Sequence, residues 1–289
     1  MFIKRSIRKL YYFILSFLPT RMVIYIEYFR YTRSLPNLSN PTKFSDKFQC
    51  MKLDNELESY CKYVDKYEVR EFVKKTIGEK YLNKLIAVYD RVEDIDFDTL
   101  PNRFVLKCTH GSGYNIICSN IKELEISKTK KKLKNWMRED FYSITREPQY
   151  KLIKPKIICE EYLDDSNDSL IDYKFFCFNG EPKFIQVVVD RNIKHKENFY
   201  NMNWQKLNMK ACYKKTLYEN TSESISRPKN MEEMILLAEK LSKDFKFVRV
   251  DFYSVNDQTI FGELTFVPAS GFTIYIPHEL NYHLGNLLE

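Results

Sequence analysis

The chain has little glycine and little histidine, and both shortages restrict the kinds of site that it can hold. Only seven of its 289 residues are glycine and four are histidine. No G-K-[ST] follows its one G-x-G, at Gly111–Gly113, so a Walker A phosphate loop is excluded, and a lone G-x-G does not define a dinucleotide fingerprint. The histidines lack metal-ligand spacing, so we expect no zinc site.

Paired cysteines, repeats and linkers are also missing. The seven cysteines are odd in number and scattered without a C-x-x-C pair, which indicates reduced thiols in a cytoplasmic protein. No internal repeat, low-complexity tract or Pro/Gly-rich linker divides the chain. Its 44% apolar and 15% aromatic content is typical of a globular protein, and its length allows more than one subdomain.

Long apolar runs are absent, and basic charge is concentrated at the N-terminus. The uncharged run Leu10–Thr20 is shorter than the roughly 20 residues that span a bilayer, and it lacks the small-residue cleavage site of a secretory signal. Residues 1–33 carry +6 of the net charge of +7. The nearly neutral remainder argues against a nucleic-acid partner. A basic, aromatic-rich helix can lie on an anionic membrane surface, and a packed helix with a basic outer face fits the pattern as well.

Apolar periodicity predicts a mixture of helices and antiparallel strands. Helices are expected after a turn at 40–42 to about residue 53, and over 61–77, 127–144 and 230–245. Strands are expected over 104–108, 114–118, 156–163, 172–178 and 182–190. Asn179-Gly180 is a strong hairpin signal, and Asn230 and Glu233 are spaced as a capping pair. Without regular strand–helix alternation, an α+β fold is favoured over a doubly wound sheet.

The most informative pattern is a β-hairpin near the C-terminus. Because side chains alternate along a strand, Arg249 and Asp251 share one face, and Glu263 and Thr265 share one face of the return strand. A turn centred near Asp257 places Asp251 opposite Glu263 and Arg249 opposite Thr265. Opposed carboxylates repel and require a cation, and oxygen ligands suit Mg²⁺ held against substrate phosphates. The alternative is a solvated hairpin face in which Arg249 neutralises both acids.

A second pattern is a strand that ends at Lys107 and enters a loop containing Gly111 and Gly113. Glycine lets backbone N–H groups approach phosphate oxygens, and the lysine adds a positive charge. A tight hairpin turn with a surface lysine explains the same residues without a ligand.

Two weaker patterns lie further along the chain. The apolar strand at 157–163 ends in acids and an aromatic residue, which can form the edge of a purine pocket. Asp172 and Lys174 share a strand face, and Arg191 follows the return strand. The first of these signals is weak on its own, and cross-strand surface charge alone explains the second. Together, the segments of the chain describe a nucleoside triphosphate site without a P-loop.

In its order of motifs the chain resembles the ATP-grasp ligases, and more closely the TupA-like ATP-grasp family of bacterial cell-surface polysaccharide loci. The resemblance runs from about Asn40 to Gly271. It rests on NPTKFSDKFQ, VDKYEVREFV, FVLKCTHGSGYNIIC, CEEYL, DYKFFCFNGEPKFIQVVVDR, NFYNMNW and FVRVDFY…FGELTFVPASGF.

The resemblance implies nucleotide-binding roles for residues in the first two-thirds of the chain. Lys66 and Lys107 would contact the ATP phosphates, and Asp172 would lie near the ribose. The loop that closes over the triphosphate would contain Thr109, His110, Gly111, Ser112 and Gly113. The hinge against adenine would contain Glu160, Glu161, Tyr162 and Leu163.

The same resemblance assigns the C-terminal hairpin to metal and catalysis. Asp251 and Glu263 would bind Mg²⁺, with Thr265 as a neutral oxygen where the family usually places asparagine. Arg249 would stabilise charge on the acyl centre. Contacts of Lys174 and Arg191 to phosphate or acceptor are also implied. Ala269 stands where a glycine is common in the family.

The implied fold is ATP-grasp, in which two α+β subdomains grip ATP. We expect a basic N-terminal helical segment at 1–40, a helical region at 41–100, a subdomain with the glycine loop at 101–162 and a subdomain with the metal hairpin at 163–289.

The implied activity is an ATP- and Mg²⁺-dependent carboxylate–amine ligase that acts through an acylphosphate. Its substrates would be a carboxylate-bearing glycan or precursor, such as a uronic acid, and an amine or amino-acid donor. It would be cytoplasmic, with a possible peripheral position at the inner face of the plasma membrane. The alternatives are a glycosyltransferase, for which Asp164-Asp165 is not the usual D-x-D motif, an ATP-dependent sugar kinase and a catalytically silent binding module.

Overall fold

The computed structural model describes residues 2–164, 170–189, 196–222 and 224–288. The helices of these residues are α1 (Phe2–Ser16), α2 (Thr20–Thr32), α3 (Phe44–Met51), α4 (Cys61–Val64), α5 (Val69–Thr76), α6 (Ile126–Met137), α7 (Phe141–Thr145), α8 (Met231–Ser242) and α9 (Leu280–Asn286). The strands are β1 (Leu85–Tyr89), β2 (Phe104–Cys108), β3 (Asn115–Cys118), β4 (Ile157–Glu161), β5 (Asp172–Phe178), β6 (Glu181–Val189), β7 (Lys196–Tyr200), β8 (Lys210–Tyr213), β9 (Thr216–Leu217), β10 (Phe247–Val255), β11 (Gln258–Thr265) and β12 (Ile274–Ile276). This mixture confirms the α+β class.

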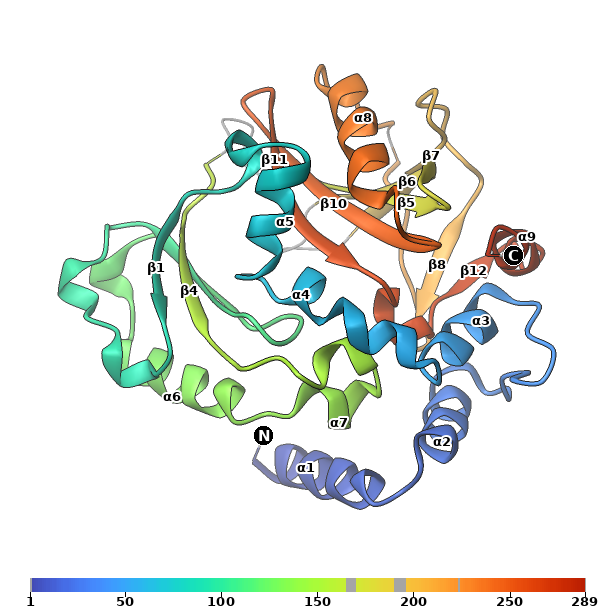
Figure 1. Ribbon diagram of the computed structural model, residues 1–289, viewed down its shortest axis with the longest axis horizontal. Helices are drawn as coiled ribbons and strands as arrows, with labels where there is room; N and C mark the ends of the chain where they lie inside the picture. Colours follow the sequence, from blue (N-terminus) through green and yellow to red (C-terminus); the bar gives the residue numbers. More distant parts are fainter. Residues whose placement is uncertain (1, 165–169, 190–195, 223, 289) are drawn as a thin grey trace.

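The smaller lobe is built on an antiparallel sheet with strand order β1-β4-β2-β3, and α6 lies alongside it (Figure 1). In β2 the side chains of Phe104, Leu106 and Cys108 are fully buried in the core, together with Leu133 of α6. Because strand side chains alternate, Lys107 lies on the opposite face of this sheet. The lobe therefore presents Lys107 away from its own core.

The larger lobe is built on an antiparallel sheet with strand order β11-β10-β5-β6-β7, and α8 covers one of its faces (Figure 1). Every residue of β5 is buried, because β5 lies between β10 and β6 and packs on both sides. A third, small sheet has the order β12-β8-β9. Helices α4 and α5 lie between the two larger sheets in Figure 1.

Both predicted hairpins are confirmed, and each has a two-residue turn that sets the register of the pairs next to it. Asn179 (φ 49°) and Gly180 (φ 82°) join β5 to β6, and Asn256 (φ 49°) and Asp257 (φ 64°) join β10 to β11. Left-handed residues at both central positions match the twist of a two-residue hairpin, and Asn, Asp and Gly tolerate that conformation best. In the second hairpin a β-bulge between Asp251 and Phe252 shifts the register by one residue, and this shift places Asp251 opposite Glu263.

Two predicted helices are interrupted by side-chain caps. The expected helix at 127–144 ends at Met137, and α7 begins after Asp140, whose carboxylate accepts a 3.1 Å hydrogen bond from Ser143 N. The expected helix at 61–77 breaks at Asp65, whose carboxylate accepts hydrogen bonds from the backbone N–H groups of Tyr67 and Glu68. An aspartate that satisfies these groups starts a new helix.

The predicted capping pair of α8 is wrong. The side chain of Asn230 instead donates to Thr259 Oγ1 (2.8 Å) and accepts from Ser254 Oγ (2.9 Å). Glu233 accepts hydrogen bonds from Thr259 (2.6 Å) and from Tyr81 Oη (2.8 Å). Both side chains bind to groups of the β10–β11 hairpin and not to the backbone N–H groups of α8, and these hydrogen bonds hold α8 against the hairpin.

The region 41–100 is not purely helical as expected, since it contains β1. Strand β1 pairs with β4, so the smaller sheet draws on both sides of the expected boundary at residue 101.

Helices α1 and α2 run along the lower edge of the molecule in Figure 1, next to α7. The Arg146 guanidinium donates a 2.6 Å hydrogen bond to the carbonyl of Leu15 and so fastens the end of α1 to the body. Among the described residues, no helix is long and apolar enough to span a bilayer.

Candidate active site

The β10–β11 hairpin has the predicted register, with Asp251 opposite Glu263 and Arg249 opposite Thr265. The Arg249 guanidinium donates to both carboxylate oxygens of Asp251 (2.7 Å each), to Glu263 Oε1 (3.1 Å) and to Thr265 Oγ1 (3.1 Å). From the neighbouring strand β5, Lys174 Nζ donates to Asp251 Oδ2 at 2.6 Å. Both cations therefore converge on Asp251.

Most of this hairpin face is buried, although the Glu263 side chain is 40% exposed. Asp251 is only 2% exposed and Lys174 only 8%. Burial acts to lower the pKa of Arg249, but Asp251 and Glu263 together outweigh it and the pKa is raised. Arg249 thus neutralises both acids, as the alternative interpretation supposed, but inside a cleft and not in solvent.

The donor set of this hairpin fits Mg²⁺ that arrives with a nucleotide. Asp251, Glu263 and Thr265 offer oxygen ligands, which Mg²⁺ prefers. The described residues contain no group of three or more His, Cys, Asp or Glu side chains that could hold an ion by themselves. Because Lys174 and Arg249 already offset the acids, phosphate oxygens would have to complete the coordination and supply negative charge.

Cations of β2 and of the α4–α5 segment form the wall that faces the hairpin. Lys107 Nζ donates to Glu160 Oε2 at 2.6 Å, and Arg70 of α5 donates to Glu160 Oε1 at 3.0 Å. Lys66 lies in the break between α4 and α5 that Asp65 creates. Burial lowers the pKa of Lys66, while Glu263 acts to raise it and Lys107 to lower it further. The two lysines and Glu263 are therefore electrostatic neighbours.

The glycine loop lies over the same wall. The Lys66 ammonium donates to the carbonyl of Gly111. A Cβ at Gly111 would lie 2.7 Å from the Tyr114 ring and 2.9 Å from the Phe141 ring, so only glycine fits there. Gly113 has a left-handed φ of 76°, which glycine adopts without strain. Both glycines are thus required by the shape of the loop.

These walls enclose a cleft between the two lobes, which we call the interlobe cleft. It brings together nine of the predicted residues: Lys66, Lys107, Ser112, Gly113, Glu160, Leu163, Lys174, Asp251 and Glu263. The sequence analysis missed the other residues that line it: Val69, Arg70, Leu82, Asn83, Asn115, Ile158, Tyr253, Phe261 and Gly262. Arg70 lies four residues after Lys66, and that spacing was a usable signal.

Several predicted nucleotide ligands lie outside the lining of this cleft. His110 is buried behind the loop, where its Nε2 lies 3.0 Å from the carbonyl of Trp136, and burial lowers its pKa. The Arg103 guanidinium lies over the Tyr162 ring, with its Cζ atom 4.1 Å from the ring centroid. The carbonyl of Glu161 accepts a hydrogen bond from Asn83 (2.9 Å). The expected contacts of these side chains with nucleotide stay predictions.

Two further predicted residues need separate mention. Asp172 is buried on β5 with one carboxylate oxygen 3.5 Å from Lys174 Nζ, and it does not line the cleft. Its expected position near a ribose stays a prediction. Arg191 lies outside the described residues.

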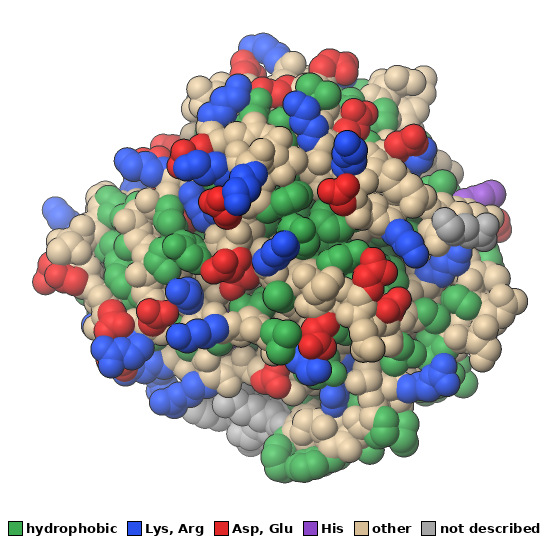
Figure 2. Space-filling view, in the orientation of Figure 1, with side chains coloured by type: hydrophobic (Ala, Val, Ile, Leu, Met, Phe, Trp, Pro, Cys, Tyr) green, Lys and Arg blue, Asp and Glu red, His purple; other side chains and the backbone are tan. Residues whose placement is uncertain are grey.

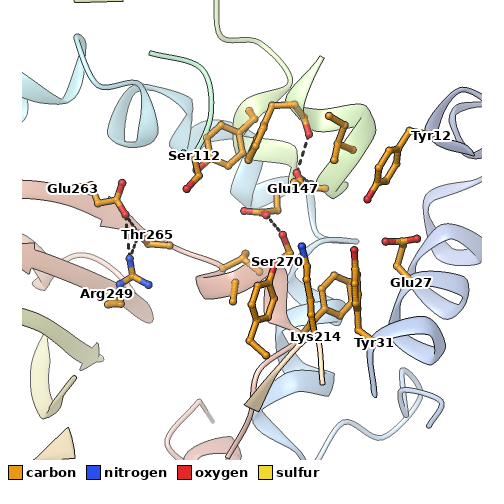
Figure 3. Close-up of a pocket in the computed structure, with 18 residues that line it drawn as sticks. Tyr12, Glu27, Tyr31, Ser112, Glu147, Lys214, Arg249, Glu263, Thr265 and Ser270 are labelled. Atoms are coloured by element: carbon orange, nitrogen blue, oxygen red, sulfur yellow. Dashed lines mark hydrogen bonds and ion pairs between the residues drawn. The ribbon is translucent and has the colours of Figure 1, made fainter. Parts of the chain in front are cut away.

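A second cavity adjoins the interlobe cleft, and we call it the tyrosine chamber. It has a volume of about 290 Å³ and shares Ser112 and Glu263 with the cleft. Figure 3 shows Glu263, Thr265 and Arg249 at one end and Tyr12 and Glu27 of α1 and α2 at the other. Its lining residues are Tyr12, Glu27, Tyr31, Ser112, Phe141, Ile144, Thr145, Glu147, Tyr150, Tyr213, Lys214, Arg249, Glu263, Thr265, Val267, Ala269, Ser270 and Phe272.

Buried polar contacts shape the middle of the chamber. Glu147 accepts hydrogen bonds from Ser270 Oγ (2.6 Å) and Gln149 Nε2 (3.0 Å). Burial raises the pKa of Glu147, and it lowers the pKa of Lys52, which lies behind Ser270 and donates to its carbonyl at 2.7 Å. Ala269 and Ser270 both have left-handed backbones (φ 50° and 55°), so the site holds strained residues.

A model of the TupA-like ATPgrasp family matches residues 46–289. No curated protein matches the chain.

Solved structures of ligases are similar to the chain at low identity and with TM-scores below 0.5. A D-alanine–D-alanine ligase from Bacillus anthracis is 17% identical with a TM-score of 0.46, covering 81% of this chain and 68% of that one. The same ligase complexed with ATP is 14% identical with a TM-score of 0.43, covering 79% and 63%. A phosphoribosylamine–glycine ligase from Thermotoga maritima is 10% identical with a TM-score of 0.42, covering 74% and 51%. The chain thus spans less than two-thirds of the length of two of these three.

Proposed function

Because the chain belongs to the TupA-like ATP-grasp family, we propose that it is an ATP- and Mg²⁺-dependent ligase that joins a carboxylate to an amine and forms ADP. The family match confirms the expected fold. The proposal rests on one observation: basic side chains on one side of the interlobe cleft face acidic side chains on the other. Lys66, Lys107 and the glycine loop face a hairpin that pairs Asp251 with Glu263.

The residues of the cleft suit phosphoryl transfer to a carboxylate. Lys66 and Lys107 would hold the triphosphate through charge-assisted hydrogen bonds. An acceptor carboxylate oxygen would attack the γ-phosphorus, forming an acylphosphate as the bond to ADP breaks. Bound at Asp251 and Glu263, Mg²⁺ would offset negative charge on the transferred group.

The second half of the reaction belongs to the chamber side of the hairpin. An amine nitrogen would attack the acyl carbon, lose a proton and expel phosphate. Arg249 lines the chamber beside Glu263 and is positioned to stabilise the oxyanion of that step. The proposed substrates are a uronic acid or related carboxylate of a bacterial cell-surface polysaccharide or its precursor, and an amino acid or other amine.

Calorimetric titration with ATP, with and without Mg²⁺, tests this proposal. We expect wild-type protein to bind ATP in a Mg²⁺-dependent way, and Glu263→Gln to lose most of that dependence because it removes a carboxylate ligand. Asp257→Asn is the matched control, since Asp257 is an exposed acid in the turn of the same hairpin. Absence of nucleotide binding in the wild type would overturn the ligase proposal.

A product assay separates ligase from kinase activity. Amine-dependent ADP release supports the ligase. ADP release without an amine, with a stable phosphorylated sugar as product, would instead show a kinase that uses the same cleft.

We also propose that the enzyme works at the cytoplasmic face of the plasma membrane, on α1 and α2. Several apolar side chains of these helices and of the turn between them are largely exposed: Ile7, Leu10, Phe13, Ile14, Phe17, Met22 and Phe29. Hydrophobic side chains gather along the lower edge of the molecule, where these helices lie (Figure 2). Exposed apolar residues on a segment with a charge of +6 fit the interface of an anionic bilayer.

Cosedimentation with phosphatidylglycerol vesicles tests the location. The Phe13→Asn/Phe17→Asn variant should partition more weakly than wild type, because Phe13 and Phe17 are 61% and 73% exposed. Leu152→Asn is the control, because Leu152 is 63% exposed outside these helices. Equal partitioning of wild type and the double variant would contradict the proposal.

A further inference from the structure

We infer that the tyrosine chamber is the acceptor site, that it takes a single sugar-sized carboxylic acid, and that α1 and α2 form the wall that recognises it. This inference rests on the proposed function and names the substrate class of that site. The family model begins at residue 46, so Tyr12, Glu27 and Tyr31 lie outside it.

The position of the chamber defines which end of the acceptor enters first. Ser112 and Glu263 line both the chamber and the interlobe cleft, so a group placed between them meets both cavities. Arg249 lies at this end (Figure 3) and is a cation that can attract a carboxylate. The acid group of the acceptor therefore points toward the cleft, and the remainder extends toward α1 and α2.

The chamber is built for a ring with polar edges. Six of its lining side chains are aromatic, and among them the Tyr31 and Phe272 rings lie 4.9 Å apart. Aromatic faces accept the C–H faces of a sugar ring, and tyrosine adds a hydroxyl at its edge. Lys214 Nζ lies 5.0 Å from the Tyr31 ring centroid and adds a donor at the same wall.

Carboxylates provide acceptors for sugar hydroxyls. Glu147 lies in the middle of the chamber and Glu27 at its far end (Figure 3), and both are buried. Arg30 Nη1 contacts Glu27 at 3.1 Å and packs on the Tyr11 ring at 4.8 Å, so the far wall is held by its own ion pair. A volume of about 290 Å³ is at the lower limit of ligand pockets, which suits one monosaccharide unit.

Binding of D-glucuronate, followed by saturation-transfer NMR and calorimetry without nucleotide, tests the inference. D-Glucose, acetate and glycine are the comparison ligands. We expect glucuronate to bind wild-type protein better than any of the three, because only glucuronate combines the acid with the polar ring. Tyr31→Leu should weaken glucuronate binding at least tenfold and leave Mg²⁺·ATP binding unchanged.

Matched variants keep the test decisive. Tyr25→Leu is the control, because Tyr25 is a half-buried tyrosine of α2 that does not line the chamber. If Tyr31→Leu lowers the melting temperature, Tyr31→Phe replaces it, with an expected loss of about twofold to tenfold from the missing hydroxyl.

Each outcome bears on one proposal. Glucuronate that binds no better than glucose or acetate overturns the inference, and so does unchanged binding by the Tyr31 variants. Tight binding of glycine in place of glucuronate would identify a donor site and overturn it as well. If wild-type protein binds glucuronate but not Mg²⁺·ATP, the ligase proposal is refuted and the assignment of the chamber as an acceptor site stands.

Discussion

Replacing Glu160 by glutamine removes the one negative charge between two cations of the interlobe cleft. The Glu160 side chain is nearly buried and accepts hydrogen bonds from Lys107 at 2.6 Å and from Arg70 at 3.0 Å. At an effective dielectric constant of about 20, each contact corresponds to roughly 6 kcal/mol of Coulomb attraction. Desolvation offsets much of that, and removing one partner of a buried pair typically costs about 3–5 kcal/mol.

The assay is thermal unfolding of Glu160→Gln without nucleotide. With an unfolding entropy of about 2.1 cal/mol/K per residue, a chain of 289 residues loses about 1.6 °C per kcal/mol, so the melting temperature should fall by roughly 5–8 °C. Glu161→Gln is the matched control, since Glu161 is the exposed neighbour on the same strand and its change should stay within about 0.5 kcal/mol.

A double variant checks the cause of the loss. Adding Lys107→Met to Glu160→Gln removes one of the two uncompensated charges, so the double variant should regain part of the lost stability. A Glu160→Gln shift no larger than that of Glu161→Gln would refute the reasoning.

Three further predictions concern Lys66, His110 and Gly285. Lys66→Met should weaken Mg²⁺·ATP binding at least tenfold in calorimetry without lowering the melting temperature, because it removes a half-buried charge whose pKa desolvation already lowers. Because the pKa of His110 is lowered in the folded protein, the His110 side chain takes up a proton just below pH 6.5 only in the unfolded chain, and the free energy of unfolding falls as the pH drops through this range. In urea titrations at several pH values, His110→Asn should show a smaller fall. Gly285→Ala places a Cβ 2.1 Å from the carbonyl oxygen of Thr42 and should cost about 1–3 kcal/mol in the same titrations, whereas Asn286→Ala, on the exposed face of α9, should not.

The sequence predicted those parts of the site that local rules determine. Side-chain alternation and a turn centred near Asp257 predicted that Asp251 pairs with Glu263. In the structure the turn at Asn256 and Asp257 alone would place Asp251 opposite Gly262, and a β-bulge between Asp251 and Phe252 shifts the register by one residue to the predicted pairing. The same rules located the strand that carries Lys107 and the loop that follows it.

Parts of the fold that depend on tertiary partners were beyond those rules. Asn230 and Glu233 have the spacing of a cap, but they bond to the β10–β11 hairpin because partners there are close in space and distant in sequence. The tyrosine chamber was missed for the same reason. Tyr12 and Glu147 are separated by more than one hundred residues, and neither belongs to a recognisable motif.

Helix α1 takes part in two surfaces at once. It contributes Tyr12 to the chamber, while Phe13 on the helix and Phe17 just after its end are exposed. Lipid binding to α1 can hold this helix in the conformation that closes the chamber. In that case lipid raises the affinity for the acceptor, and the acceptor raises the affinity for lipid by the same factor, because coupling between two ligands is reciprocal. Typical coupling energies of about 1–3 kcal/mol correspond to 5–150-fold. Such an enzyme would favour acceptors presented at a bilayer over the same molecules free in solution, and the selection would come from one short helix.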